Sequence, residues 1–221
     1  KEVLKMAENK KLLLAEAIWT RYLPSRTIIA DIIASGVLGT IESVDSNLGY
    51  DIQKNERIRN KSLAGGALLD LSVYPINFTL MFFDSDIYRI ESSVVFDKDT
   101  GVDGKECISL IYANGMIATC RTNIYANLDR RGVINGDKGY LEITNINNPE
   151  AIKLYDTNYT LIKEYKIPTQ LTGFEYEVQE CLDCISKGLI ETPSMPHSET
   201  LRFMEICDHL RDSWDYHFPF E

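Results

Sequence analysis

The spacing of hydrophobic positions changes along the chain, and the first part differs from the rest. Residues 1–11 (KEVLKMAENKK) scatter apolar side chains among lysines and glutamates, which is typical of an amphipathic helix. The next run, residues 11–19 (KLLLAEAIW), is continuously apolar and predicts a strand buried on both faces in a parallel sheet. A helix leading into a buried strand is half of an α/β unit, and the sequence offers no partner strands for it. We therefore expect the chain to begin inside a larger α/β domain.

Two stretches before residue 84 have the spacing of helices that bury one face. Residues 25–35 (SRTIIADIIAS) place isoleucines at helical spacing, and glycines follow at positions 36 and 39. Residues 64–83 (AGGALLDLSVYPINFTLMFF) are strongly apolar, with Pro75 inside, where the missing N–H predicts a kink. Between these helices, residues 40–50 alternate like a strand, and residues 51–64 form a polar loop long enough to be functional.

The pattern changes to period two from residue 87 to residue 168. The predicted strands are separated by the turn signals Asn114-Gly115, Asn135-Gly136 and Asn147-Asn148-Pro149. Such short connections favour antiparallel pairing. Residues 173–188 and 198–214 then predict two more amphipathic helices. We expect an α+β fold, in which an open, mostly antiparallel sheet is covered by helices on one face.

The composition adds exclusions to this fold class. The chain has 221 residues, of which 44% are hydrophobic and 25% charged, and no apolar run approaches the ~20 residues of a membrane span. The net charge of −10 makes a nucleic-acid partner unlikely, because an acidic surface repels phosphate backbones. Five cysteines, an odd count, suit a reducing compartment better than a disulfide framework. We expect a cytoplasmic protein without a membrane span.

Most motifs that would identify an active site are absent from the sequence. No G-x-G-x-x-G follows a strand, and neither a Walker-type loop nor a nucleophile elbow occurs. Residues 136–139 (GDKG) lie between two predicted strands and favour a hairpin turn. Cys181 and Cys184 have redox-motif spacing but fall within a predicted helix, and the three histidines lack metal-ligand spacing. We expect thiols without chemistry and no metal site.

One constellation is chemically suggestive. Asp70 and Tyr74 are separated by four residues, so on a helix the carboxylate and the phenol project from one face of an otherwise apolar segment. A phenol is a general acid at neutral pH, and it becomes a base where a nearby cation lowers its pKa. The alternative is structural, with Asp70 at the loop entrance and Tyr74 a core aromatic with a satisfied hydroxyl. Residues 19–22 (WTRY) likewise line a ligand cleft or form an ordinary interdomain contact.

These segments together carry a family resemblance. The matching residues are AEAIWTRYLP (15–24), IASGVLGTIESV (33–44), ERIRNKSLAGGALLDLSVYPI (56–76), IYANGMIAT (111–119), GVINGDKGYLEI (132–143), GFEYEVQECLDCISKG (173–188) and SETLRFMEICDHLRDSW (198–214). The element GGALLD-x-x-x-YP is the most specific. The chain resembles the glucose-fructose oxidoreductase, inositol dehydrogenase and rhizopine catabolism family (Gfo/Idh/MocA), in particular its branch of dimeric dihydrodiol dehydrogenase and NADP-dependent xylose dehydrogenase.

The resemblance implies a two-domain enzyme. Residues 1–22 would be the last helix and strand of an N-terminal Rossmann domain, which binds NAD(P), and residues 23–221 an α+β domain that binds substrate and forms a homodimer through its sheet. The phosphate-binding glycines and an E-K-P motif with a catalytic lysine are expected upstream of Lys1. Two departures from the family pattern, Ala64 and Ser72 where glycine is common, are small residues, and we expect no loss of function from them.

The resemblance also implies roles for individual residues. Tyr74 matches the family's acid/base tyrosine and Asp70 the aspartate that positions substrate, while Trp19, Arg21 and, less directly, Arg57 match the substrate and nicotinamide cleft. The implied reaction transfers hydride between NAD(P) and a sugar-like or diol substrate. Two alternatives stay open: a non-catalytic sheet-mediated dimerisation or sugar-binding module, and an isomerisation, elimination or hydrolysis that uses tightly held NAD.

Overall fold

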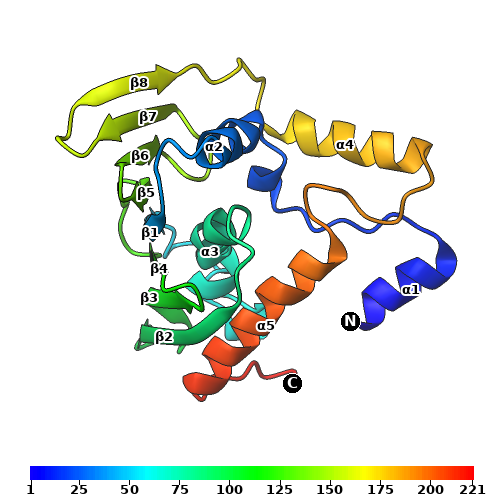
Figure 1. Ribbon diagram of the computed structural model, residues 1–221. Helices are drawn as coiled ribbons and strands as arrows, with labels where there is room; N and C mark the ends of the chain where they lie inside the picture. The colour runs from blue at the N-terminus through cyan, green and yellow to red at the C-terminus, as the bar shows by residue number, and fades with distance from the viewer.

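Eight strands form one open sheet in the computed structural model, which describes residues 1–221 (Figure 1). Their order across the sheet is β2-β3-β4-β1-β5-β6-β7-β8. The strands are β1 (Ile41–Gly49), β2 (Ile87–Phe96), β3 (Asp103–Tyr112), β4 (Ile117–Asn123), β5 (Gly132–Gly136), β6 (Gly139–Thr144), β7 (Ala151–Asp156) and β8 (Leu161–Tyr165). Every neighbouring pair is antiparallel except β1 and β4, which run parallel at the centre. The mostly antiparallel sheet predicted from the sequence is confirmed.

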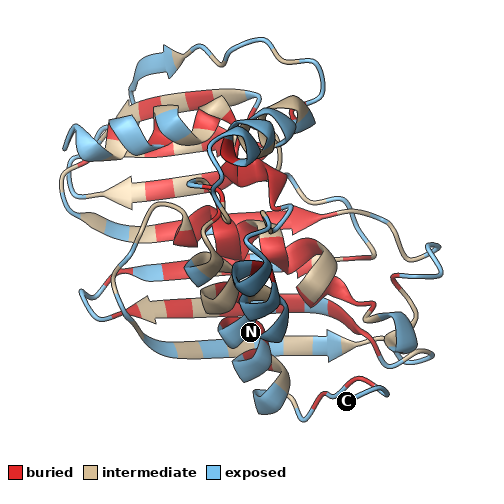
Figure 2. Ribbon diagram, turned by 90° about the vertical axis from the view of Figure 1, so that its right-hand side faces the viewer, coloured by how far each residue is buried: buried red, intermediate tan, exposed pale blue.

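The helices lie on one side of this sheet and leave the other side bare (Figure 1). They are α1 (Glu2–Lys10), α2 (Pro24–Ala34), α3 (Val73–Leu80), α4 (Phe174–Ser186) and α5 (His197–Ser213), together with the short 3₁₀ turns η1 (Trp19–Arg21) and η2 (Lys61–Leu63). Alternate residues of β3 and β4 are buried, as expected for strands with one covered face. Figure 2 shows the covered face, with the buried segments concentrated behind the helices. The predicted α+β fold is therefore confirmed.

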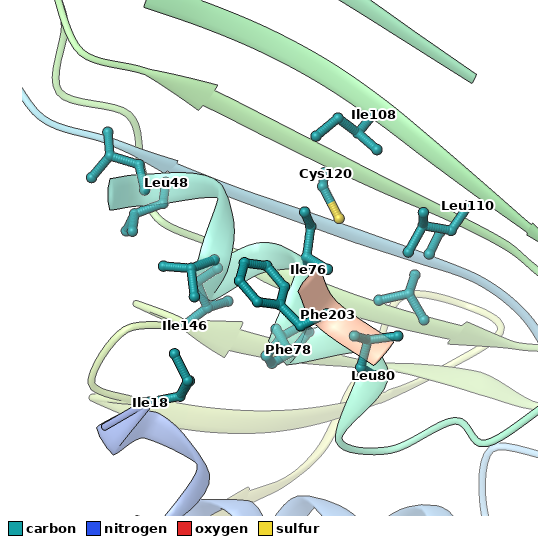
Figure 3. Close-up of a cluster of buried hydrophobic side chains, with 14 of the residues drawn as sticks. Ile18, Leu48, Ile76, Phe78, Leu80, Ile108, Leu110, Cys120, Ile146 and Phe203 are labelled. Atoms are coloured by element: carbon teal, nitrogen blue, oxygen red, sulfur yellow. The ribbon is translucent and has the colours of Figure 1, made fainter. Parts of the chain in front are cut away.

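The hydrophobic core lies between α3 and the middle strands. Ile76 and Leu80 of α3 belong with Ile108 of β3 and Cys120 of β4 to one cluster of 34 buried residues (Figure 3). Because α3 contributes apolar side chains on all sides, seven of its eight residues are buried. The stretch Lys61–Leu80 is long and apolar enough to cross a membrane by length and composition alone, but 72% of its most apolar window is covered by the protein itself.

The strand expected at residues 11–19 is not formed, and this prediction is wrong. Residues 12–18 have no strand structure. Their backbone hydrogen bond to a distant segment runs from the Leu14 N–H to the Ile190 carbonyl. A strand exists only as part of a ladder, and no neighbouring strand lies beside these residues. The amphipathic helix expected before them is confirmed as α1.

The long helix expected over residues 64–83 is interrupted. Ala64 is left-handed, the chain then forms a five-residue π-helical turn over Leu68–Ser72, which we call the π turn, and a regular α-helix begins only at Val73. Pro75 therefore lies in the first turn of α3, where its missing N–H is tolerated. The irregularity that Pro75 predicts lies just before it, in the π turn, rather than as a kink in the helix interior.

Candidate functional site

Two glycines bring the loop and the sheet against the start of the π turn. A Cβ atom at Gly65 would collide with the carbonyl oxygen of Arg57, and one at Gly66 would collide with the carboxylate of Asp103. Gly66 also has a φ of 127°, which side-chain-bearing residues avoid. The glycines in the sequence motif therefore allow close packing, and this packing fixes where Asp70 and Tyr74 stand.

Asp70 lies within the π turn, and Tyr74 lies in the first turn of α3. π-helical turns insert one extra residue into a helix and are frequent at functional sites. Both residues lie in one continuous helical stretch, and the charge of Asp70 is among the causes that raise the pKa of Tyr74. The structure thus brings together the pair that the sequence places four residues apart.

Tyr74 is half-buried, and its surroundings keep its hydroxyl protonated. Burial is the largest cause of its raised pKa; hydrogen bonding with the Trp19 side chain opposes this rise, and the charges of Asp70, Tyr50 and Glu177 add to it. A phenol whose pKa lies above its usual value is a proton donor at neutral pH. To act as a base it would need a cation close to its oxygen.

Asp70 offers one free oxygen. Its Oδ1 atom accepts a hydrogen bond from the guanidinium of Arg57, in an ion pair whose arginine side chain is 51% exposed and whose aspartate side chain is 16% exposed. Its Oδ2 atom is buried and has no partner. A buried carboxylate oxygen without a donor is costly, and a substrate hydroxyl would satisfy it. Arg57 therefore joins the site by orienting Asp70.

Trp19 forms the wall opposite the π turn. Its ring is buried and packs against the ring of Phe174 with centroids 4.6 Å apart and planes tilted by 38°. Gly173, with a φ of 96°, permits this contact, because a Cβ there would lie 2.6 Å from the Trp19 ring. The start of α4 thus covers η1.

Two residues of α4 were not anticipated from the sequence. Phe174 packs on Trp19, and Glu177, one turn later, has a buried Oε2 atom without a partner and contributes to the raised pKa of Tyr74. Their spacing of three residues puts both on one helix face, and this spacing is the sequence signal that could have identified them. The sequence does not show that this face meets Trp19, about 150 residues earlier.

Arg21 is not brought together with the other site residues. Its side chain is buried; Nη2 donates to Glu199 Oε2 of α5 at 2.6 Å, and Nη1 donates to Sδ of Met195, just before α5, at 3.1 Å. Burial lowers the pKa of Arg21 to about 10, and the charge of Glu199 opposes this shift. Its contacts anchor η1 to α5 and thereby hold Trp19 in place.

Other features of the chain lie apart from this site. All five cysteines are free thiols, including Cys181 and Cys184 on α4. No group of three or more His, Cys, Asp or Glu side chains is arranged to hold a metal ion. A cavity of about 590 Å³ opens between α1 and α5, and neither Asp70, Tyr74 nor Trp19 lines it. The candidate site is instead the surface where the π turn, η1 and the start of α4 meet.

The chain resembles known proteins in both family and sequence. The family model described as GFO/IDH/MocA C-terminal domain matches residues 28–142. The chain is 26% identical over 227 residues to trans-1,2-dihydrobenzene-1,2-diol dehydrogenase from Mus musculus, covering 99% of this chain and 67% of that protein. It is 28% identical to the Danio rerio enzyme of the same name, covering 95% of this chain and 64% of that protein.

Solved structures show the same fold at lower sequence identity. The aldose-aldose oxidoreductase from Caulobacter crescentus, complexed with glycerol, superposes with a TM-score of 0.81 at 18% identity, covering 93% of this chain and 62% of that one. A 3-ketoreductase from Actinomadura kijaniata, in complex with NADP and TDP-benzene, superposes with a TM-score of 0.74 at 19% identity, covering 82% and 57%. The chain therefore spans about two thirds or less of the length of these proteins.

Proposed function

Because the chain belongs to the GFO/IDH/MocA family, we propose that it is the substrate-binding and dimerisation domain of an NAD(P)-dependent oxidoreductase that acts on sugar-like or diol hydroxyls. The observation that carries the proposal is the pairing of a protonated phenol, Tyr74, with the unpartnered Oδ2 atom of Asp70. The relatives support it by name, since they are diol dehydrogenases and sugar oxidoreductases.

Residues 1–22 are, in this proposal, the last part of a dinucleotide-binding domain, and residues 23–221 the second domain. Support comes from residues 12–18, a mainly apolar run that has no strand beside it. The phosphate-binding part of the cofactor site belongs to that other domain, while this chain supplies the substrate side.

The surface around Tyr74 fits the nicotinamide end of such a cofactor. Trp19 and Phe174 form an aromatic wall beside the phenol, and Asp70 Oδ2 provides an acceptor that lacks a donor. NAD(P), when bound, supplies or takes up the hydride. The chain's own residues then have two tasks, which are to orient the substrate and to move the hydroxyl proton.

Tyr74 performs the proton transfer. In the reducing direction its O–H donates the proton to the carbonyl oxygen of the substrate, whose carbon receives the hydride. In the oxidising direction the phenolate oxygen accepts the proton of the substrate hydroxyl, which requires a cation that lowers the pKa of Tyr74. The lysine implied by the family resemblance, outside this chain, would provide it.

Asp70 and the aromatic wall orient the substrate. The Oδ2 atom of Asp70 accepts a hydrogen bond from a substrate hydroxyl, while Arg57 holds Oδ1 and so fixes the carboxylate plane. Trp19 and Phe174 exclude water from the opposite side. A substrate with at least one hydroxyl beside the reacting carbon satisfies both the carboxylate and the phenol.

Replacing Tyr74 with Phe in the complete protein tests this role. We expect kcat to fall by ~10²–10⁴, with little change in cofactor affinity, because only the acid/base group is removed. Tyr159→Phe is the matched control, since Tyr159 lies in the turn between β7 and β8 and is 81% exposed. Unchanged turnover in Tyr74→Phe would remove Tyr74 from the mechanism.

The bare face of the sheet is the proposed homodimer interface. Residues that alternate with the buried positions of a strand point away from the helices. They include Ile117 of β4, Val133 of β5 and the stacked rings of Tyr140 and Tyr155 on β6 and β7. Ile117→Lys is expected to dissociate the dimer in sedimentation equilibrium, because it buries a charge at the contact. A monomeric wild type would contradict this interface.

A non-catalytic binding or dimerisation module is the second candidate. The extensive uncovered sheet face is the observation that favours it (Figure 1). In that case the complete protein would dimerise and bind sugars but would transfer no hydride in a single-turnover assay with NAD(P). Transient cofactor reduction without net consumption would instead indicate the isomerisation, elimination or hydrolysis alternative.

A further inference from the structure

Two carboxyl side chains of β3 lie directly beneath the π turn. Asp103 is 2% exposed and Glu106 is 5% exposed, and both face the helices rather than the bare side of the sheet. Neither forms a salt bridge with a lysine or arginine; their hydrogen bonds go to the π turn and to β4. Buried acids without cations need another explanation, because an ionised carboxylate is strongly disfavoured in such surroundings.

Each carboxyl holds one end of the π turn. The backbone N–H of Leu68, the first residue of the turn, donates to Asp103 Oδ2 at 2.6 Å. The hydroxyl of Ser72, the last residue of the turn, donates to Glu106 Oε2 and also lies 2.7 Å from the hydroxyl of Thr122 on β4. Asp70 lies between these two anchored ends, and Tyr74 follows two residues after the second.

The remaining oxygen of Glu106 indicates a proton. Its Oε1 atom is buried and has no hydrogen-bond partner, and no lysine or arginine forms an ion pair with the carboxyl. A buried carboxyl without a cation beside it is more stable protonated than ionised. Burial, followed by the neighbouring Asp103, raises the pKa of Glu106 well above its usual value, and burial also raises the pKa of Asp103.

No cation forms an ion pair with these two carboxyls: Arg211 lies near Cys207 and Tyr216 but pairs with Asp208 and Glu221, and Lys61 Nζ lies over the Tyr216 ring. Cys207 on α5 feels the charge of Glu106, and Tyr216, after α5, feels that of Asp103. The pKa of each is raised above its usual value, mainly by burial, so both are neutral at physiological pH. Ser72 and Thr122 do not titrate. The environment therefore favours a protonated Glu106 beside Asp103 over two carboxylates.

We propose that Glu106 is a positioning residue for Tyr74 and Asp70: it keeps a proton, and together with Asp103 it braces both ends of the π turn. The brace sets the spacing between the phenol and the carboxylate. Its consequence for turnover rests on the proposed function, whereas the proton and the brace are properties of the fold and are tested without activity.

The pH dependence of unfolding tests the proton. Glu106 has an ordinary pKa of about 4.5 when the chain is unfolded and a raised one when folded, so its stabilising contribution is full below that pH and is lost as pH rises toward the folded value. Over this window the unfolding equilibrium constant of the wild type rises by up to about tenfold per pH unit from this group. Glu106→Gln keeps the shape and a hydrogen-bond donor but cannot ionise.

We therefore expect the ratio of the wild-type to the Glu106→Gln unfolding constant to rise at least tenfold between pH ~5 and pH ~8 in urea titrations. Glu91→Gln on β2 is the matched control, because Glu91 is exposed and the same chemical change there should leave the ratio flat. A ratio for Glu106→Gln that is constant, or that falls with pH, would overturn the proposal.

A second measurement follows the proton in the wild-type chain and does not require that a Glu106 variant folds. Carboxyl-carbon NMR of the wild-type chain should show that Glu106 titrates above the range of an ordinary glutamate. Titration of its signal in the ordinary range would overturn the retained proton. The carboxyl-carbon signal of Glu106 is identified by its absence in Glu106→Gln. If that variant does not fold, the signal is identified by its shift in Ser72→Ala.

The positioning role has its own readouts. Glu106→Ala should change the titration of Tyr74, which ring-carbon NMR follows. In the complete protein Glu106→Ala should lower kcat about tenfold with little change in KM for the cofactor. Glu106→Gln should restore both the Tyr74 titration and kcat. If Glu106→Ala leaves both unchanged, the positioning role is wrong. If the complete protein transfers no hydride at all, the proposed function fails, and the Tyr74 titration still decides the brace.

Discussion

Helix α3 carries Tyr74 and helix α4 lies near it, yet the two helices are held in very different ways. Seven of the eight residues of α3 are buried, and its entrance is fixed by two glycines and two carboxyls. α4 has thirteen residues, of which Cys184 alone is buried, while Phe174, Val178, Leu182 and Ile185 are each more than half exposed. Tyr74, the proposed proton-transfer group, thus stands on the rigid side of the site, and the opposite wall is only lightly attached.

This difference has a functional meaning. Proton transfer needs a donor fixed to within a fraction of an ångström, which the densely packed side provides. A wall that closes over a substrate needs freedom to move, and regions with few buried contacts open at low free-energy cost. The α4 side therefore suits substrate entry, while the α3 side suits chemistry.

The largest expected effect tests the packing half of the comparison. Phe78 of α3 is 2% exposed and packs edge-on against Phe82, with centroids 5.6 Å apart. Phe78→Ala should destabilise the chain by about 3–5 kcal/mol, because it removes a large side chain from the core and leaves a cavity. Val178→Ala on α4, at a position 56% exposed, should change stability by less than about 0.5 kcal/mol. Urea unfolding of both variants measures the contrast, and equal losses would refute it.

The second effect concerns chemistry on the rigid side. Asp70→Asn keeps the shape of the side chain but removes the charge that Arg57 and a substrate hydroxyl share. Losing a hydrogen bond to a charged group costs about 1.5–3 kcal/mol, so kcat/KM of the complete protein should fall about 10- to 100-fold while its stability changes little. Asp212→Asn on the exposed surface of α5 is the control. Near-normal kinetics in Asp70→Asn would leave Asp70 a structural role.

Local patterns predicted most of the frame. The period-two strands, the turn at residues 136–139, α2 and the two C-terminal helices follow from short-range spacing, and each appears in the structure. The glycines before Asp70 were visible as a motif, and the structure explains them by contacts with Arg57 and Asp103. Periodicity works for these elements because the spacing that defines them is set by residues close together in the sequence.

The failures share one cause, which is dependence on distant residues. The apolar run at residues 12–18 reads as a strand, but a strand forms only beside another strand. The π turn depends on carboxyls of β3 more than 30 residues later, and the parallel pairing of β1 with β4 joins segments about 70 residues apart. The family resemblance implied a place in the cleft for Arg21, whereas its side chain pairs with Glu199 on α5.

The smallest effect tests the lightly attached wall. Phe174→Ala removes the ring that packs on Trp19, and since Phe174 is 53% exposed, the loss should be about 0.5–1.5 kcal/mol. Trp19 should become more exposed, which shifts its fluorescence to longer wavelength; a Trp214→Phe background isolates its signal from the second tryptophan. In the complete protein KM for substrate should rise several-fold while kcat changes less, because the variant opens the wall without touching the proton donor. Val178→Ala, one turn further along α4, is the matched control. If Phe174→Ala lowered kcat as strongly as Tyr74→Phe, the two sides would act as one rigid unit and the contrast between them would be lost.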